Sequence, residues 1–211
     1  MRKRAVICGL FLLLFFPLVV HGLSSIDYFP LVLDAKWEYE NPSLKTSDII
    51  YSTKKITGNH TASEFLCFDL QEDVDFLGIS NSVVHSYAYD IHPNFSRILE
   101  IERTTRNQLV GVQSHDFNPP LITLRDPLKV GCSWWVGNDG NGYSINRKIV
   151  KFETINTPAG TFTNCIKIRE DQSVDGKPFS SGYYWYAPNV GLVKGITEGK
   201  LVEYNIPSTN R

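Results

Sequence analysis

The chain has 211 residues, with 21 Lys and Arg against 22 Asp and Glu, and a formal net charge of −1. This balance argues against nucleic-acid binding, which relies on an excess of basic residues that neutralise phosphates. The length is sufficient for one domain with its own hydrophobic core.

The first residues are typical of an export signal. A basic start is followed by an apolar run at 5–20 and then by small or neutral residues, the pattern that signal peptidases process. The run is short for a bilayer-spanning helix, which needs about 20 apolar residues. We therefore predict a signal peptide at 1–22 and a single mature β domain at 23–211. The mature protein is expected to be soluble in the periplasm or outside the cell, with no stable membrane anchor.

Alternating apolar and polar residues predict β-strands along most of the mature chain. In chain order, the alternating segments are 35–40, 83–91, 97–103, 147–155, 165–170 and 200–206. Turn-forming residues are concentrated at 57–60, 116–120, 137–142, 157–161 and 174–178. No segment keeps a helical period over three turns, although 65–77 could hold a short helix. The patterns predict a mainly β fold, a curved antiparallel sheet or half-barrel whose edges are closed or covered.

Two stretches of the chain share a motif at the same spacing. "PLVLDAKW" at 30–37 and "PLKVGCSW" at 127–134 both contain Pro-Leu, an aliphatic residue and a tryptophan in equivalent positions. A tyrosine stands four residues before a proline in each half, at Tyr89 and Tyr184. Chance matches are common in a β protein rich in Pro and Tyr, so two interpretations stay open. The matches are coincidental, or the chain contains an internal repeat of 28–110 and 125–205.

Four consecutive aromatic residues occur in "SGYYWYAP" at 181–188. In a strand, side chains alternate between faces, so Tyr183 and Trp185 point to one side while Tyr184 and Tyr186 point to the other. A strand covered on both faces explains the run without a ligand, and only one pair of rings could line a cavity. The candidate aromatic residues for a core or an apolar ligand are Trp37, Trp134, Tyr183 and Trp185.

The mature chain has three cysteines, Cys67, Cys132 and Cys165. In an oxidising compartment one disulfide can form among them, with one thiol left over. Alternatively, they lie in apolar strand positions and act as small hydrophobic residues. Their spacing matches no zinc motif and no redox pair.

No catalytic motif is present. Ser133 follows a Gly-x pattern, but Trp135 stands where a nucleophile elbow needs its second glycine, and no histidine follows His115. The mature histidines are His60, His85, His92 and His115, and their spacing forms no metal motif. We therefore predict no catalytic residue, no metal site and no cofactor.

The second half of the chain resembles a family of exported bacterial proteins. The segments "PLKVGCSWWV", "ETINTPAGTFTNCIKI", "YYWYAPNVGLVK" and "KLVEYNI" are similar to the motifs of the TapB-like or DUF3108-like proteins. The resemblance covers roughly 28–211 and is strongest over 127–194. It implies a LolA/LolB-like fold, in which a curved antiparallel sheet wraps around an apolar cavity or plug. It implies no catalytic residue, and Asp34 and Ala35 depart from the glycine that is frequent in the first motif.

Three functions follow as expectations. The first is a non-enzymatic exported β protein that binds a lipid, another apolar ligand or an envelope protein. The second is a hydrolase with an irregular histidine-containing site, built by residues such as His85, His92 or His115. The third is a structural or assembly module without a small ligand. No nucleic-acid partner is expected for any of them.

Overall fold

The computed structural model describes residues 23–42, 49–76, 79–108, 111–138 and 142–208. The predicted signal peptide at 1–22 therefore lies outside the described residues. Within the described ranges, no helix is long and apolar enough to cross a membrane.

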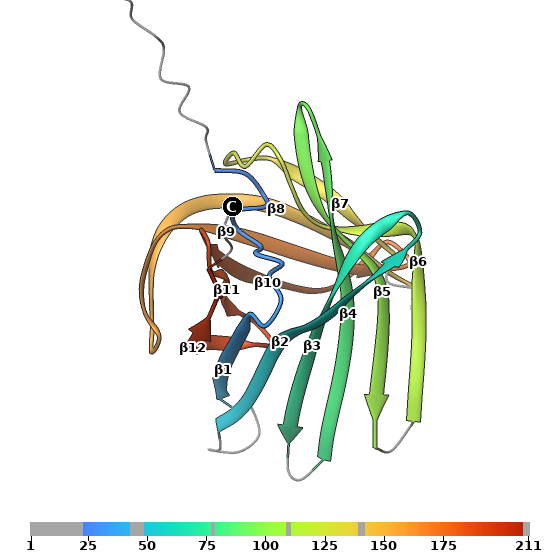
Figure 1. The fold of residues 1–211 in the computed structure, drawn as a ribbon. Helices are drawn as coiled ribbons and strands as arrows, with labels where there is room; N and C mark the ends of the chain where they lie inside the picture. The colour runs from blue at the N-terminus through green and yellow to red at the C-terminus, as the bar shows by residue number, and fades with distance from the viewer. Residues whose placement is uncertain (1–22, 43–48, 77–78, 109–110, 139–141, 209–211) are drawn as a thin grey trace, which may run out of the picture.

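The described residues form twelve strands in one antiparallel sheet. The strands are β1 (Lys36–Pro42), β2 (Ile49–Ala62), β3 (Phe65–Phe76), β4 (Ile79–His92), β5 (Phe95–Asn107), β6 (Gly111–Arg125), β7 (Ser133–Asn138), β8 (Tyr143–Thr157), β9 (Gly160–Val174), β10 (Lys177–Ala187), β11 (Gly191–Gly195) and β12 (Gly199–Asn205). The spatial order is β6-β5-β4-β3-β2-β1-β12-β11-β10-β9-β8-β7. Figure 1 shows how the sheet curls until its two halves face each other. The predicted curved antiparallel sheet is confirmed.

The curl ends at a seam between the edge strands β6 and β7. No hydrogen-bonded ladder joins these two strands in the described part of the chain, and side chains bridge them instead. The indole Nε1 of Trp134 donates to the carbonyl of Ile122 at 2.9 Å. Arg147 Nη1 donates to the carbonyl of Thr123 at 2.7 Å. Unpaired edge strands are templates for pairing with other chains, so these contacts protect an edge that would otherwise promote aggregation.

Two predicted turns are wrong, because segment 57–60 lies inside β2 and segment 116–120 lies inside β6. The region considered for a short helix is a strand at Phe65–Phe76, which is β3. Both supposed turns coincide with β-bulges, because the register shifts near Gly58 in β2 and opposite Glu100 in β6. Turn-forming residues also suit a bulge, where an extra residue bends the strand without reversing the chain.

Two other predicted turns are confirmed. Segment 157–161 joins β8 to β9, and segment 174–178 joins β9 to β10, each between strands that pair with each other. The turn predicted at 137–142 includes residues outside the described part of the chain.

The segment before β1 passes through the space that the sheet encloses (Figure 1). Tyr28 is buried there and its hydroxyl donates to the carbonyl of Asn164 at 2.9 Å. The Tyr89 hydroxyl accepts from the backbone N–H of Leu31 at 2.6 Å and donates to the carbonyl of Phe29 at 3.0 Å. This N-terminal segment, residues 23–35, is thus fixed to both halves of the sheet and fills part of the interior.

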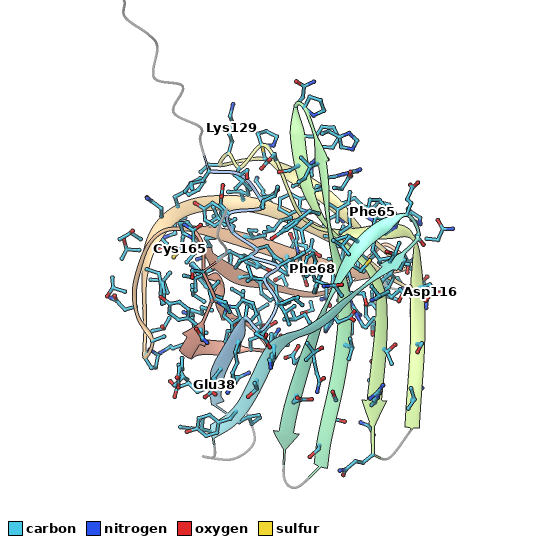
Figure 2. The ribbon with its side chains drawn as sticks, viewed as in Figure 1. Glu38, Phe65, Phe68, Asp116, Lys129 and Cys165 are labelled. Carbon is cyan, nitrogen blue, oxygen red and sulfur yellow. The ribbon has the colours of Figure 1, made fainter. Side chains whose placement is uncertain are left out.

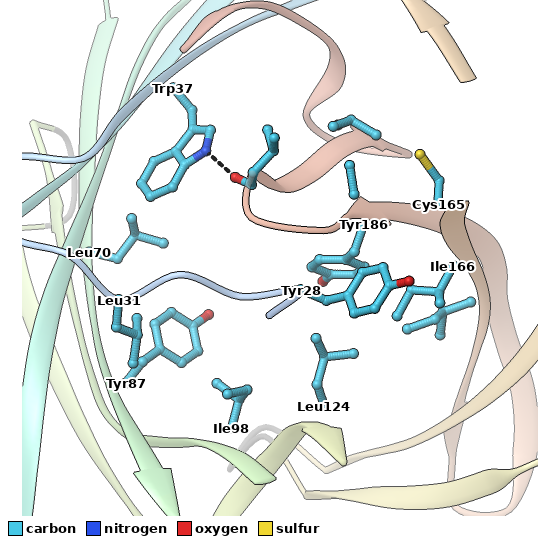
Figure 3. Packing of buried hydrophobic residues seen from close by; sticks show 14 of the residues in the cluster. Tyr28, Leu31, Trp37, Leu70, Tyr87, Ile98, Leu124, Cys165, Ile166 and Tyr186 are labelled. Carbon is cyan, nitrogen blue, oxygen red and sulfur yellow. Dashed lines mark hydrogen bonds between the residues drawn. The ribbon is translucent and has the colours of Figure 1, made fainter. Parts of the chain in front are cut away.

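Side chains from both halves of the sheet pack around the N-terminal segment (Figures 2 and 3). The largest fully buried apolar side chains of this core come from seven different strands and the N-terminal segment: Tyr28, Tyr39, Ile56, Ile98, Leu124, Ile149, Ile166, Ile168 and Leu201. Neighbouring residues of a strand point to opposite faces. The apolar residues at every second position of each strand therefore point inward and form a common core.

The three described cysteines are free thiols in this structure. Cys165 belongs to the main core and Cys67 to a smaller cluster with Ala88, Leu99 and Ile101. Burial raises the pKa of the Cys165 thiol to about 11, which makes it a poor nucleophile. A disulfide among the three stays a prediction.

The repeated motifs occupy equivalent strands of two six-strand halves, β1–β6 and β7–β12. Trp37 and Trp134 lie on the first strand of each half, Cys67 and Cys165 on the third, and Tyr89 and Tyr184 on the fourth. An internal repeat predicts this placement, and the repeat itself stays a prediction.

Candidate functional site

A cavity of about 370 Å³ lies inside the curved sheet, beside the N-terminal segment. Four tyrosines lie on its wall, Tyr39, Tyr87, Tyr184 and Tyr186. Eight ionisable side chains share the wall with them: Lys54, Glu72, His85, Glu100, Arg103, Arg147, Glu170 and Glu198. The wall is therefore aromatic and charged, whereas the family resemblance implied an apolar cavity or plug.

Lys54 of β2 joins the two halves of the sheet through the cavity. Its Nζ lies 3.1 Å from Glu72 Oε2 on β3 and 3.1 Å from Oε1 of Glu198, which lies between β11 and β12. Burial lowers the pKa of Lys54, but the charges of Glu198 and Glu72 outweigh burial and hold the pKa well above its usual value. The two carboxylates therefore favour the charged form of the ammonium group.

A second group of charges lies on β4 and β5. His85 Nδ1 is 2.8 Å from Glu100 Oε1, and Arg103 donates to both oxygens of Glu100, at 2.8 and 3.0 Å. Burial raises the pKa of Glu100, but the hydrogen bond and charge of His85 and the charge of Arg103 outweigh it and lower the pKa to about 2. His85 Nε2 also lies 3.9 Å from Glu72, which connects this group to Lys54.

The low pKa of Glu100 predicts a loss of stability in acid. A carboxylate whose pKa is lower in the folded state stabilises the fold above its unfolded pKa, and this contribution disappears as the pH falls through the folded value. We expect the difference in free energy of unfolding between wild type and Glu100→Gln to shrink by about 3 kcal/mol as the pH falls from about 5 to about 2. Urea unfolding across this range measures the difference. A difference independent of pH would mean that Glu100 titrates alike in the folded and unfolded states.

The third group lies beside the seam, on β8 and β9. Arg147 Nη2 is 2.6 Å from Glu170 Oε2, and Gln172 donates to the other oxygen of Glu170 at 2.8 Å. The Arg147 guanidinium also lies 5.7 Å from the centre of the Tyr184 ring. Burial lowers the pKa of Arg147, but Tyr186 and Glu170 raise it above its usual value. Arg147 thus ties the cavity wall to the edge strand β6.

Each of the eight ionisable groups on the wall has an acidic or basic partner within the wall, at 2.6–3.1 Å, and Lys54 is shared by two carboxylates. Among the described residues, the wall carries no serine or cysteine, so the hydroxyls found there are those of threonine and tyrosine. Within the described ranges, no group of three or more His, Cys, Asp and Glu side chains could hold a metal ion. The arrangement offers many hydrogen-bond donors and acceptors but no unpaired charge.

The four aromatic residues predicted from the sequence lie in different environments. Trp37 lies on the cavity wall and donates through Nε1 to the carbonyl of Val190 at 2.6 Å (Figure 3). Trp134 is buried at the seam, away from the cavity. Tyr183 is 38% exposed, so its placement in the core was wrong. Trp185 lies beside it on the outer face.

The other two rings of the aromatic run, Tyr184 and Tyr186, face the cavity. The alternation of faces is as predicted. Tyr183 and Trp185, the candidates from this run, are not on the cavity wall, although Trp185 packs against the main core. Sequence reasoning also missed every charged residue of the wall except His85, which it considered only as part of an irregular histidine site. His115, considered in the same way, is exposed on β6 and packs against Phe117.

A second hollow, of about 660 Å³, lies at the far ends of β2–β6. Its lining includes exposed residues such as Tyr51, Asp73 and Arg106. Although it is larger, it is a surface depression, and the buried cavity with its paired charges is the stronger candidate site.

Comparison with known proteins gives few matches. No curated protein matches the chain. One similar solved structure is a protein from Parabacteroides distasonis named as a candidate lipoprotein, with 14% identity, a TM-score of 0.39, and coverage of 84% of this chain and 98% of that one. Another is a protein from Bacteroides fragilis named as a candidate exported protein with a YmcC-like fold, with 13% identity, a TM-score of 0.35, and the same coverage.

A family match supports the motifs found in the second half. The model of the DUF3108-like family matches residues 138–200. This stretch contains the motifs at 153–168 and 183–194 on which the resemblance was based. The similarity to TapB-like proteins and to LolA/LolB-type folds stays a prediction. Over residues 138–200, the predicted resemblance to DUF3108-like proteins is confirmed.

Proposed function

We propose that this protein is an exported, non-enzymatic binding protein whose internal cavity holds a small polar molecule without net charge. The observation that carries the proposal is the cavity wall, on which every ionisable group is already paired. A ligand with a lone charge would have to displace one partner and leave a buried ion uncompensated, which is costly. A neutral polar ligand can donate to the carboxylates and accept from the cations without breaking a pair.

The size of the cavity supports a small ligand. Its volume of about 370 Å³ is near the lower end of the range for ligand pockets and equals the volume of about a dozen water molecules. A sugar or a zwitterionic amino acid fits these limits, with the tyrosine rings covering its apolar faces. A two-chain lipid exceeds the volume and would bring acyl chains against the buried charges.

Two carboxylates of the wall are unsuited to act as the general base of a hydrolase. A general base at neutral pH needs a pKa near 7, whereas the pKa of Glu100 is about 2 and the pKa of Glu198 is also lowered. The wall also lacks a serine or cysteine nucleophile among its described residues. The predicted signal peptide supports a periplasmic or extracellular location, where such a protein would capture or carry its ligand.

Native mass spectrometry of the gently purified mature chain, followed by thermal melting with added probes, tests the proposal. We expect a neutral disaccharide or a zwitterionic amino acid to raise the melting temperature, and palmitate to leave it unchanged. Tyr184→Leu should weaken binding of the active probe about tenfold. Tyr183→Leu, which removes the neighbouring ring on the outer face, should leave the affinity unchanged. A co-purifying lipid, or stabilisation by palmitate alone, would contradict the polar ligand and favour the apolar one.

A further inference from the structure

A row of four lysines centred on a tryptophan crosses the outer face of five adjacent strands. Lys151 on β8 pairs with Lys167 on β9, which pairs with Trp185 on β10. Trp185 pairs with Lys194 on β11, which pairs with Lys200 on β12. Neighbouring strands are about 4.8 Å apart, so this lysine row is about 19 Å long. Residues directly opposite each other share a face of the sheet.

The lysine row has an excess of positive charge, with two carboxylates beside it: Glu153 accepts from the Trp185 indole at 2.8 Å, and Glu40 on β1 is directly opposite Lys200. Like charges opposite each other destabilise a sheet, and the row contains two such pairs, Lys151 with Lys167 and Lys194 with Lys200. Among the described residues, only Lys151 of the row has an ion pair, with Glu153 at 2.7 Å. By contrast, the exposed Lys55 on β2 is neutralised by Asp34 at 3.0 Å.

Aromatic rings hold the central lysines in place. Lys167 Nζ lies 4.1 Å from the centre of the Tyr183 ring and 4.8 Å from that of Trp185. Lys194 Nζ lies 4.5 Å from the Trp185 ring. Cation–π contacts of this kind fix the ammonium groups beside the rings, which lowers the entropy lost on binding. Ammonium groups and partly exposed rings therefore face solvent together.

A shorter basic row lies parallel to the lysine row. Lys148 on β8 pairs with Arg169 on β9, which pairs with Tyr183 on β10. Asp171 is the acidic partner of Arg169, at 2.8 Å. The outer face of β8–β12 is thus basic and aromatic, although the chain as a whole has a net charge of −1.

We propose that the lysine row docks the protein onto an anionic phospholipid surface. Lysines near such a surface are attracted to its phosphate groups, and Trp and Tyr rings favour the boundary between headgroups and acyl chains. An acidic peptide is less suited to this face. All five strands are paired on both sides, so they leave no free edge to which an extended peptide could add as a strand. This docking does not depend on the ligand of the internal cavity.

Flotation of the mature chain with lipid vesicles tests the proposal. We expect binding to vesicles of phosphatidylglycerol and phosphatidylcholine, no binding to phosphatidylcholine alone, and weaker binding as salt screens the charges. The double variant Lys167→Gln/Lys194→Gln should bind about 30-fold more weakly, since each lysine contributes about fivefold. The matched control Lys36→Gln/Lys55→Gln makes the same change in net charge on β1 and β2 and should bind like wild type.

Trp185 provides an independent readout of the orientation. Its fluorescence should shift to the blue on vesicle binding, and Trp185→Phe should abolish the shift while thermal melting shows an intact fold. Equal weakening by both double variants would overturn the proposal, because it would show that net charge alone governs binding. Binding of heparin that depends on Lys167 and Lys194, without binding to the anionic vesicles, would assign the row to a soluble polyanion and also overturn it.

Discussion

Replacing Lys54 with methionine is expected to lower the free energy of unfolding by about 3–5 kcal/mol. The Lys54 ammonium forms ion pairs with both Glu72 and Glu198 at 3.1 Å, and all three side chains are largely buried. Methionine preserves much of the volume of the side chain but leaves two carboxylates facing each other without a cation. The loss in free energy of unfolding should be smaller in mild acid. Burial and mutual repulsion raise the pKa of carboxylates that have lost their partner, so acid protonates them and removes the repulsion.

Lys55→Met is the matched control for this prediction. Lys55 is the next residue of β2, points to the outer face and pairs with the exposed Asp34, so its removal should change the stability by less than about 1 kcal/mol. Urea unfolding of both variants at neutral and mildly acid pH provides the comparison. Similar losses from the two variants would show that the buried cluster contributes no more than a surface ion pair.

The strands were predictable because each buries one face. In an antiparallel sheet with a core on one side, apolar residues recur at every second position, and the predicted segments 147–155 and 165–170 lie within β8 and β9. The joining of the two halves into one sheet was not predictable in this way. It depends on β1 pairing with β12, for example Trp37 with Tyr204, and no local pattern specifies a contact between opposite ends of the domain.

The errors at Gly58 and at 116–120 have a common cause. Glycine, proline and asparagine indicate that the backbone departs from a regular strand, but not whether the chain reverses or only bulges. In β2 and β6 the pairing with neighbouring strands continues on both sides of the irregularity. Pairing with neighbouring strands therefore determines whether such residues form a turn or a bulge, and the local sequence does not specify this pairing.

The polar cavity wall has a recognisable signal in the sequence, which the strand prediction did not use. Arg147 stands between Ile145 and Ile149 in the inward-facing phase of β8, and Glu170 follows Ile168 in the same phase of β9. Charged residues at apolar positions of a strand indicate buried ion pairs or a polar interior. The partner of a buried charge could not be predicted where it lies far away in the sequence. Lys54 and Glu198, for example, are 144 positions apart.

Arg147→Met should be as destabilising as the change at Lys54, but with a different local consequence. The Arg147 guanidinium binds Glu170 and also donates to the carbonyl of Thr123 on the edge strand β6. Its loss leaves Glu170 without a cation and removes one of the side chains that bridge the seam. We expect a decrease of about 3–5 kcal/mol in the free energy of unfolding and faster amide hydrogen exchange around the seam between β6 and β7.

Two further variants separate charge from geometry at this position. Arg147→Lys keeps the positive charge but lacks the planar fork that binds Glu170 and Thr123 together, so it should restore part of the stability without restoring the slow exchange at the seam. Lys148→Met, on the outer face next to Arg147, should change the stability by no more than about 0.5 kcal/mol. If Arg147→Met exchanged no faster at the seam than Lys54→Met, the hydrogen bond from the Trp134 indole to the Ile122 carbonyl would be sufficient to close the sheet, and Arg147 would serve the cavity alone.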